Sequence, residues 1–128
     1  MEQIEFYCSK DFKAGGMEEI RLGFESGLTF DQVALYAKEE FGSNQMEQIR
    51  IGLQNGLSTK TVQFYADSNY FTDQMEQIRL GLESGLSIEQ LSLIILMIIL
   101  MIIAIKDMYL IIRHWYLKMM LQGCLCIH

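Results

Sequence analysis

Residues 73–87 read Asp-Gln-Met-Glu-Gln-Ile-Arg-Leu-Gly-Leu-Glu-Ser-Gly-Leu-Ser, and this stretch occurs three times with small changes in a chain of 128 residues. The other copies run over 17–29 and 46–58, so Met17, Met46 and Met75 are each 29 residues apart. A fixed period in this range is typical of stacked helical repeats. The repeat therefore predicts that the chain is all-α and that each unit packs on the next.

The first half of each unit has the pattern of an amphipathic helix. At about 100° per residue, Met75, Ile78 and Leu82 share one face of a helix. Asp73 and Glu76 have the spacing of a capping box, which predicts where this helix begins, and Asn44 and Glu47 repeat that spacing. The helix is expected to end at a glycine in the left-handed conformation, at Gly27, Gly56 and Gly85.

A shorter helix is expected after each of these glycines. Thr29 with Gln32, and Ser87 with Gln90, form capping boxes for it. It is expected to run from Phe30 to about Ala37 in one unit, and over 59–66 in the next. An aromatic residue then closes the unit, at Phe12, Phe41 and Tyr70.

A second glycine lies inside each long helix, at Gly23, Gly52 and Gly81. Glycine in a helix interior costs about 1 kcal/mol relative to alanine. Its return in every copy predicts that another backbone packs closely there, with a mid-helix break as the alternative. Leu22, Ile51 and Leu80 lie on a different side of the helix, which predicts a second packing neighbour.

The units predict a two-part chain. Residues 1–90 form an acidic repeat region, with a partial unit at 1–12, full units at 13–41 and 42–70, and an incomplete unit at 71–93. Residues 91–128 form a hydrophobic C-terminal helical tail in which the repeat pattern is lost. The predicted fold is thus a short stack of helix-turn-helix-like hairpins followed by a hydrophobic C-terminal helix.

The tail allows three interpretations. Residues 91–105 carry no charge and would make about 22 Å of helix, against a bilayer core of about 30 Å. Lys106, Arg113 and Trp115 follow the run and resemble an inside flank with an interfacial aromatic residue, which would place the repeats outside. The other interpretations are a packed or oligomerising helix and an out-of-frame translation after Leu93.

Charge is divided unevenly between the two parts. Through Gln90 there are 7 Lys or Arg against 15 Asp or Glu, a net of −8, and from Leu91 onward 3 against 1, a net of +2. An acidic repeat region argues against a nucleic-acid surface, because phosphate binding needs clustered Lys and Arg. The alternative of a helix-turn-helix-like DNA-binding module rests on residues 53–65, where only Lys60 and Gln63 suit base contacts.

No enzymatic constellation is recognisable, so neither a catalytic residue nor a small-molecule or cofactor site is predicted. Cys124, Cys126 and His128 lie close together, but a closed zinc site takes four ligands at wider spacing, so no metal site is predicted. Cys8 aligns with Ala37 and is expected to be a small buried thiol. The acidic N-terminus and unpaired cysteines favour a cytoplasmic or membrane-associated protein that is not secreted.

Two charges recur once per unit and form a candidate partner-binding ladder of six residues: Glu18, Glu47, Glu76, Arg21, Arg50 and Arg79. The competing interpretation is a solvated helix face with local ion pairs. Spacings of three and four residues also place Glu76, Arg79 and Glu83 within reach of one another on one helix.

The pattern Gln-Met-x-x-Ile-Arg-x-Gly-Leu-x-x-Gly-Leu-Ser, followed by Tyr-Ala-x-x-x-Phe, resembles short helical repeats in uncharacterised proteins of gut Firmicutes, often associated with mobile elements. Gln45, Met46, Arg50 and Gly52 are among the matching positions, and the resemblance covers residues 1–93. It implies a helical array in a bacterial cell and no known activity. The expected function is that of a non-enzymatic scaffold for an unknown protein partner, with membrane contact through 91–105; a truncated or frame-shifted product without independent function is a further alternative.

Overall fold

The computed structural model describes residues 2–8 and 11–125, and this part of the chain forms helices and no strands. The all-α prediction is therefore confirmed, as is the long apolar helix at the C-terminal end. The helices are α1 (Glu2–Cys8), α2 (Ala14–Glu25), α3 (Phe30–Tyr36), α4 (Ser43–Gln54), α5 (Thr59–Gln63), α6 (Thr72–Glu83) and α7 (Ile88–Leu125). The chain divides into two compact units, one up to Leu91 and one from Ser92 onward.

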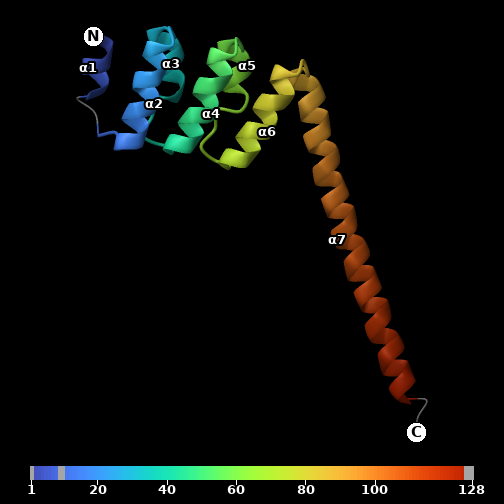
Figure 1. The fold of residues 1–128 in the computed structure, drawn as a ribbon. Coiled ribbons are helices and arrows are strands. Elements are labelled where there is room, and N and C mark those ends of the chain that lie inside the picture. Colours follow the sequence, from blue (N-terminus) through green and yellow to red (C-terminus); the bar gives the residue numbers. More distant parts are fainter. Residues whose placement is uncertain (1, 9–10, 126–128) are drawn as a thin grey trace. The chain divides into compact units, whose positions relative to one another are not determined.

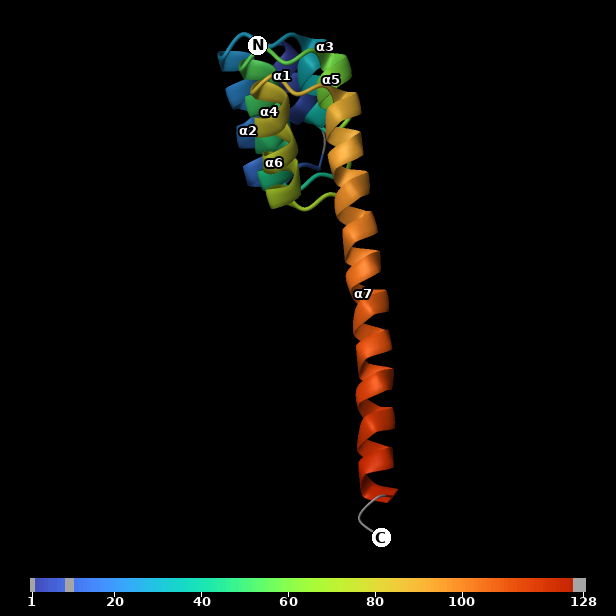
Figure 2. The same ribbon diagram turned by 90° about the vertical axis from the view of Figure 1, so that its right-hand side faces the viewer.

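In the first unit the helices form two rows. The long helices α2, α4 and α6 lie side by side, with α4 in contact with both neighbours, and the short helices α1, α3 and α5 form the second row (Figures 1 and 2). Each long helix has 12 residues, and their first residues are 29 apart. The core lies between the rows and includes fully buried side chains at Ile20, Val33, Met46, Ile49, Val62 and Met75.

The face of α6 that faces the core is the one that its sequence pattern predicts. Met75, Ile78 and Leu82 are all buried, at 0%, 8% and 6% exposure. The apolar residue on the other side of each long helix differs in exposure from one unit to the next. Leu22 and Ile51 are half-buried, whereas Leu80 is 45% exposed. α6 is the last of the long helices, so within the first unit no further long helix follows to cover Leu80.

The predicted starts of the long helices are wrong by two residues. α6 begins after Phe71 rather than after Asp73, and α4 begins after Gly42 rather than after Asn44. In both, a glutamine in the first turn reaches back: Phe71 N–H donates to Gln74 Oε1, and Gly42 N–H donates to Gln45 Oε1, each at 2.9 Å. This half of a capping box needs no side chain on the first residue, which is why a phenylalanine and a glycine can occupy that position.

The predicted helix ends are confirmed. Gly27, Gly56 and Gly85 have φ of 93°, 92° and 101°, a region where a side chain is strained. After α2, the N–H of Leu28 donates to the carbonyl of Gly23, and the N–H of Gly27 donates to the carbonyl of Phe24, both at 3.1 Å. This pair of bonds is the Schellman motif, and the same pair follows α4 and α6.

The helices that follow the turn glycines, α3, α5 and α7, start where the sequence predicts. Thr29 and Gln32 exchange the two bonds of a capping box, and Ser87 and Gln90 do the same. α3 ends at Tyr36, in agreement with the expected end at about Ala37, whereas α5 ends at Gln63, three residues before the expected end at about Ala66. Bonds of the i→i+3 type take over at the end of α5, as is common in the last turn of a helix.

The N-terminal edge of the first unit is closed by aromatic rings. Tyr7 of α1 is 3% exposed, and its ring stacks on Phe30 with centroids 5.7 Å apart. The rings of Phe12 and Phe24 also lie beside that of Tyr7, each with its centroid 6.1 Å from the Tyr7 centroid. Cys8 is exposed, so the prediction of a buried thiol is wrong: none of the described elements covers its side chain.

α7 is a single helix of 38 residues. Its first turn, from Ile88 to Leu91, belongs to the first unit, where Leu91 is 7% exposed. From Ser92 onward the helix passes without a break through Lys106 and Asp107, and its described side chains are almost all exposed.

Candidate interaction surface

The internal glycines of α2 and α4 make room for a tyrosine, not for another backbone. A Cβ placed on Gly23 would lie 1.9 Å from the hydroxyl oxygen of Tyr36, and one on Gly52 would lie 2.0 Å from that of Tyr65. The prediction of close packing is therefore right, but the predicted partner is wrong. At Gly81 the neighbour is the flexible end of Leu91, because position 94 is Ile and not Tyr.

Each of these tyrosines is held by one hydrogen bond to the helix that it packs against. Tyr36 Oη donates to the carbonyl of Glu19 at 2.9 Å, and Tyr65 Oη donates to that of Gln48 at 3.1 Å. Both rings are fully buried. Burial raises the pKa of both phenols, because the ionised form would lose its hydration.

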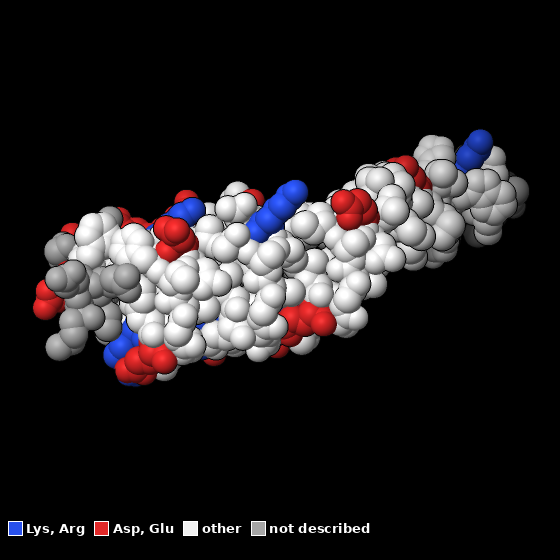
Figure 3. Space-filling model, turned by 90° about the horizontal axis from the view of Figure 1, so that it is seen from above, with Lys and Arg blue, Asp and Glu red and all other residues white. Residues whose placement is uncertain are grey.

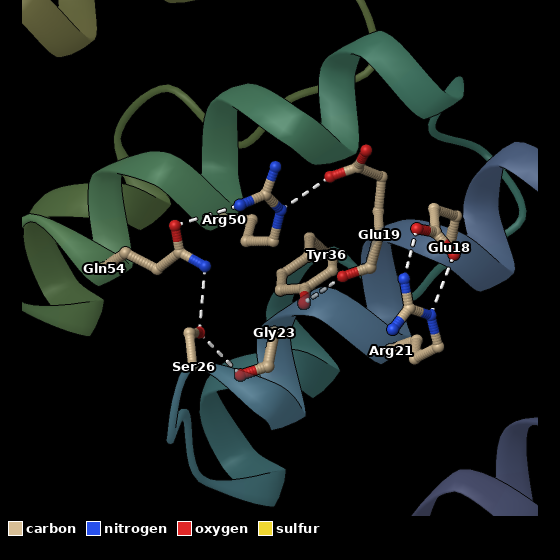
Figure 4. Close-up of polar contacts among 8 residues, drawn as sticks. All are labelled: Glu18, Glu19, Arg21, Gly23, Ser26, Tyr36, Arg50 and Gln54. Atoms are coloured by element: carbon tan, nitrogen blue, oxygen red, sulfur yellow. Dashed lines mark hydrogen bonds and ion pairs between the residues drawn. The ribbon is translucent and has the colours of Figure 1, made fainter.

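A polar network joins α2 to α4 (Figure 4). Arg50 Nε donates to Glu19 Oε2 at 2.6 Å, and both side chains are largely buried, with 11% and 13% exposed. Arg50 Nη1 also donates to Gln54 Oε1, and Gln54 Nε2 donates to Ser26 Oγ, both at 2.9 Å. The network thus runs from the middle of α2 to the residue that follows its last turn.

The same network is found between α4 and α6. Arg79 Nε donates to Gln48 Oε1 at 3.0 Å, and its Nη1 donates to both carboxylate oxygens of Glu83 at 2.9 Å. Asn55 Nδ2 donates to Glu83 Oε1 at 2.9 Å. The predicted pairing of Arg79 with Glu83 is confirmed, and the bond from Arg79 to Gln48 is a contact that the sequence did not predict. A signal was available, since the equivalent position is polar in every copy.

Arg21 has a different environment, although it is the equivalent arginine of α2. It pairs with Glu18 of its own helix (Figure 4). It also pairs with Glu25 of the same helix, and all three side chains are about half exposed. The hydrogen bond from Arg21 lowers the pKa of the Glu18 carboxyl. No long helix precedes α2 in the described chain, so Arg21 has no earlier helix to reach.

The six ladder residues therefore do not share one environment. Arg50 and Arg79 lie between helices, Glu18 and Arg21 are exposed, and Glu47 and Glu76 are half-buried. Arg50 and Arg79 bond to the preceding long helix, so Glu18 and Arg21 are the two ladder residues with the most exposed side chains. Binding of a partner by this ladder stays a prediction.

Basic side chains do not gather on the face drawn in Figure 3, where they are separated from one another by uncharged surface. Lys60 and Gln63 are both exposed, but they belong to α5, a helix of only five residues. The DNA-binding alternative stays a prediction, and neither observation favours it.

One hollow of about 460 Å³ lies where α2 and α4 begin. It is lined by the loop residues Asp11, Lys13 and Glu39 and by Ser43, together with glycine and apolar side chains. Among the described residues, no group of three or more His, Cys, Asp and Glu side chains is placed to hold a metal ion. The side chain of Cys124, with Cys126 and His128, lies outside the described part, so that cluster is not placed.

The last surface is that of α7. Over Ile88–Gly123 this helix is long and apolar enough to cross a membrane, with a mean hydropathy of 2.7 in its candidate window and only 6% of that window buried. A core helix of a soluble protein can match the same length and composition, but such a helix is mostly buried.

The chain matches no protein-family model, and no match to it was found among curated proteins or among solved structures.

Proposed function

We propose that this protein is a non-enzymatic helical scaffold in which a short tandem array of helix pairs is tethered to a membrane by α7. The observation that carries the tether is the contrast between the two parts of the chain. Up to Leu91 the apolar side chains close a core, whereas Leu96, Leu100 and Met101 in α7 are 52%, 56% and 61% exposed. Apolar surface of this extent on a soluble chain would drive association with a membrane or another protein.

The length of the helix supports a complete crossing. The apolar stretch is longer than the uncharged run 91–105, because α7 continues through Lys106 and Asp107 into 108–112, which is again uncharged. The 22 residues over 91–112 make about 33 Å of helix, close to the thickness of a bilayer core. Tyr109, Trp115 and Tyr116 then supply aromatic residues of the kind that favour the membrane interface.

Three features repeated at the same interval support the tandem array. The long helices begin at equivalent positions, their glycine ends share one hydrogen-bond pattern, and the two buried arginines each bond to a residue of the preceding long helix. An array of this kind offers an extended surface to a protein partner. We place the contact at the exposed pair Glu18 and Arg21, where the charged side chains are not used to join helices.

Flotation tests the tether. The full chain is expressed in a bacterial host, membranes are washed in alkaline carbonate, and the sample is floated through a density gradient, which separates lipid-bound protein from aggregate. The wild-type chain is expected to float, and a variant with Ile98→Arg and Met101→Arg is expected to lose flotation, because charge at the centre of a span costs about 2.5–3.5 kcal/mol per residue. A matched control places Arg at exposed Gln122, beyond the apolar stretch. Recovery of the wild-type chain in the soluble fraction would overturn the tether.

A further inference from the structure

The leucines of α7 are not scattered around the helix. They occur in a stripe whose successive members alternate three and four residues apart without a break: Leu93, Leu96, Leu100, Ile103, Asp107, Leu110, His114, Leu117 and Leu121. We call this set the leucine stripe. Its seven apolar members are exposed, at 50% to 67%. Isoleucine and methionine occupy most of the other positions of the apolar stretch.

Alternation of three and four is the seven-residue repeat of a coiled coil, in which the two stripe positions of each repeat, a and d, pack into holes of the facing helix. Straight α-helices have 3.6 residues per turn, so a stripe kept over four repeats implies a partner helix that supercoils with it. Asp107 and His114 stand at a positions. A polar residue at a is known to set register and partner number in such pairs.

The two neighbouring charges Lys106 and Asp107 identify the partner. Adjacent residues on a helix do not face each other, and in the described structure neither side chain forms an ion pair. In a parallel pair of identical helices, the hole that receives Asp107 is formed by positions 103, 106, 107 and 110 of the facing helix. Lys106 of a second copy therefore lies beside Asp107, and the symmetry of the pair makes this ion pair twice.

The outer face of α7 shows in which medium the pairing occurs. Ile98, Ile105 and Ile112 lie farthest from the stripe and are apolar, whereas a coiled coil in water has polar residues there. Lipid is the medium that accepts such a face, and charged residues within a span usually pair inside a helix bundle. We propose that α7 pairs in parallel with α7 of a second copy of this chain, within the membrane, through the leucine stripe. This inference rests on the membrane tether proposed above.

Cysteine crosslinking tests the pairing in the full chain. Cys8, Cys124 and Cys126 are replaced by serine, and a single cysteine is placed either on the stripe, as Leu100→Cys or Leu110→Cys, or on the outer face, as Ile98→Cys or Ile112→Cys. Membranes are oxidised with copper phenanthroline and dimers are quantified by gel electrophoresis. The stripe variants are expected to crosslink several-fold more than the outer-face variants. Crosslinks between identical positions also require a parallel, in-register pair.

Charge exchange tests the ion pair. In the Leu100→Cys background, Lys106→Asp places two acidic groups together and is expected to lower the dimer yield several-fold, whereas Lys106→Asp with Asp107→Lys is expected to restore it. Every sample is also floated. A chain that does not float overturns the tether and the pairing in the membrane together. A chain that floats but crosslinks equally at stripe and outer-face positions, or not at all, overturns the pairing alone.

Discussion

The packing of a tyrosine against a glycine predicts that one substitution has opposite effects at equivalent positions. In Gly52→Ala, the new Cβ would lie 2.0 Å from Tyr65 Oη, far inside van der Waals contact. The ring is fully buried, so the side chain must move within a packed core, which typically costs about 1–3 kcal/mol. The hydroxyl also loses its bond to the Gln48 carbonyl, a further loss of about 0.5–1.5 kcal/mol.

The helix itself gains from this substitution, because alanine is better than glycine in a helix interior by about 1 kcal/mol. Taking the three effects together, we expect Gly52→Ala to lower the free energy of unfolding by about 2 kcal/mol. Gly81→Ala is the matched control, since its Cβ would lie 3.0 Å from Leu91 Cδ2, at the end of a side chain that can rotate. This control is expected to change stability by between zero and a gain of about 1 kcal/mol.

A double-mutant cycle isolates the hydroxyl. Tyr65→Phe removes the oxygen, and the nearest ring carbon, Cζ, is then 3.3 Å from the new Cβ of Gly52→Ala. The double variant is therefore expected to be more stable than Gly52→Ala alone, although Tyr65→Phe by itself is destabilising. Stability is measured by urea unfolding of the full chain in mild detergent, followed by far-ultraviolet circular dichroism. Additive effects of the two substitutions, or a harmless Gly52→Ala, would refute the reasoning.

Three further predictions follow from the described contacts. Arg79→Leu leaves the buried Gln48 amide oxygen without its donor and removes both Arg79 bonds to the half-buried Glu83 carboxylate, so it is expected to destabilise the chain by about 1–3 kcal/mol. Arg21→Leu, at an exposed pair, should cost less than about 1 kcal/mol, and equal losses by urea unfolding would contradict the assigned environments. Gly56→Ala forces a side chain to φ of 92° and is expected to cost about 1–2 kcal/mol, which a thermal melt beside the Gly81→Ala control would detect as a lowered midpoint. Burial raises the pKa of Tyr36 and Tyr65, so as the pH rises the unfolded chain loses these protons before the folded chain does, and the free energy of unfolding should fall above a pH of about 10. A variant with both tyrosines changed to Phe should show a shallower fall. An unchanged dependence of stability on pH would contradict the raised pKa values.

Local structure was largely predictable from the sequence of this chain. The glycines that end the long helices need a positive φ, and no neighbour in space is required to explain them. Thr29 and Ser87 likewise indicate where α3 and α7 start, through glutamines three positions away. The starts at Gly42 and Phe71 were missed because the capping group there is a glutamine in the first turn, while Asp73 and Asn44 offered a more familiar first residue.

The candidate surface was less predictable, because it depends on what lies opposite each helix. Arg21, Arg50 and Arg79 each occur in the same local sequence, so the sequence predicts the same environment for all three. Their environments differ because Arg50 and Arg79 each bond to the long helix before them, whereas in the described part of the chain no long helix precedes that of Arg21.

The sequence by itself determined the helices, their 29-residue recurrence, their glycine ends and the apolar character of the last one, since each of these depends on residues within one or two turns. Only the tertiary structure decided that a tyrosine hydroxyl fills the space at Gly23 and Gly52, and that two of the three arginines are bonded between helices. The physical reason is that these contacts join residues 13 to 31 positions apart, and side chains so distant in the chain meet only when the helices have packed.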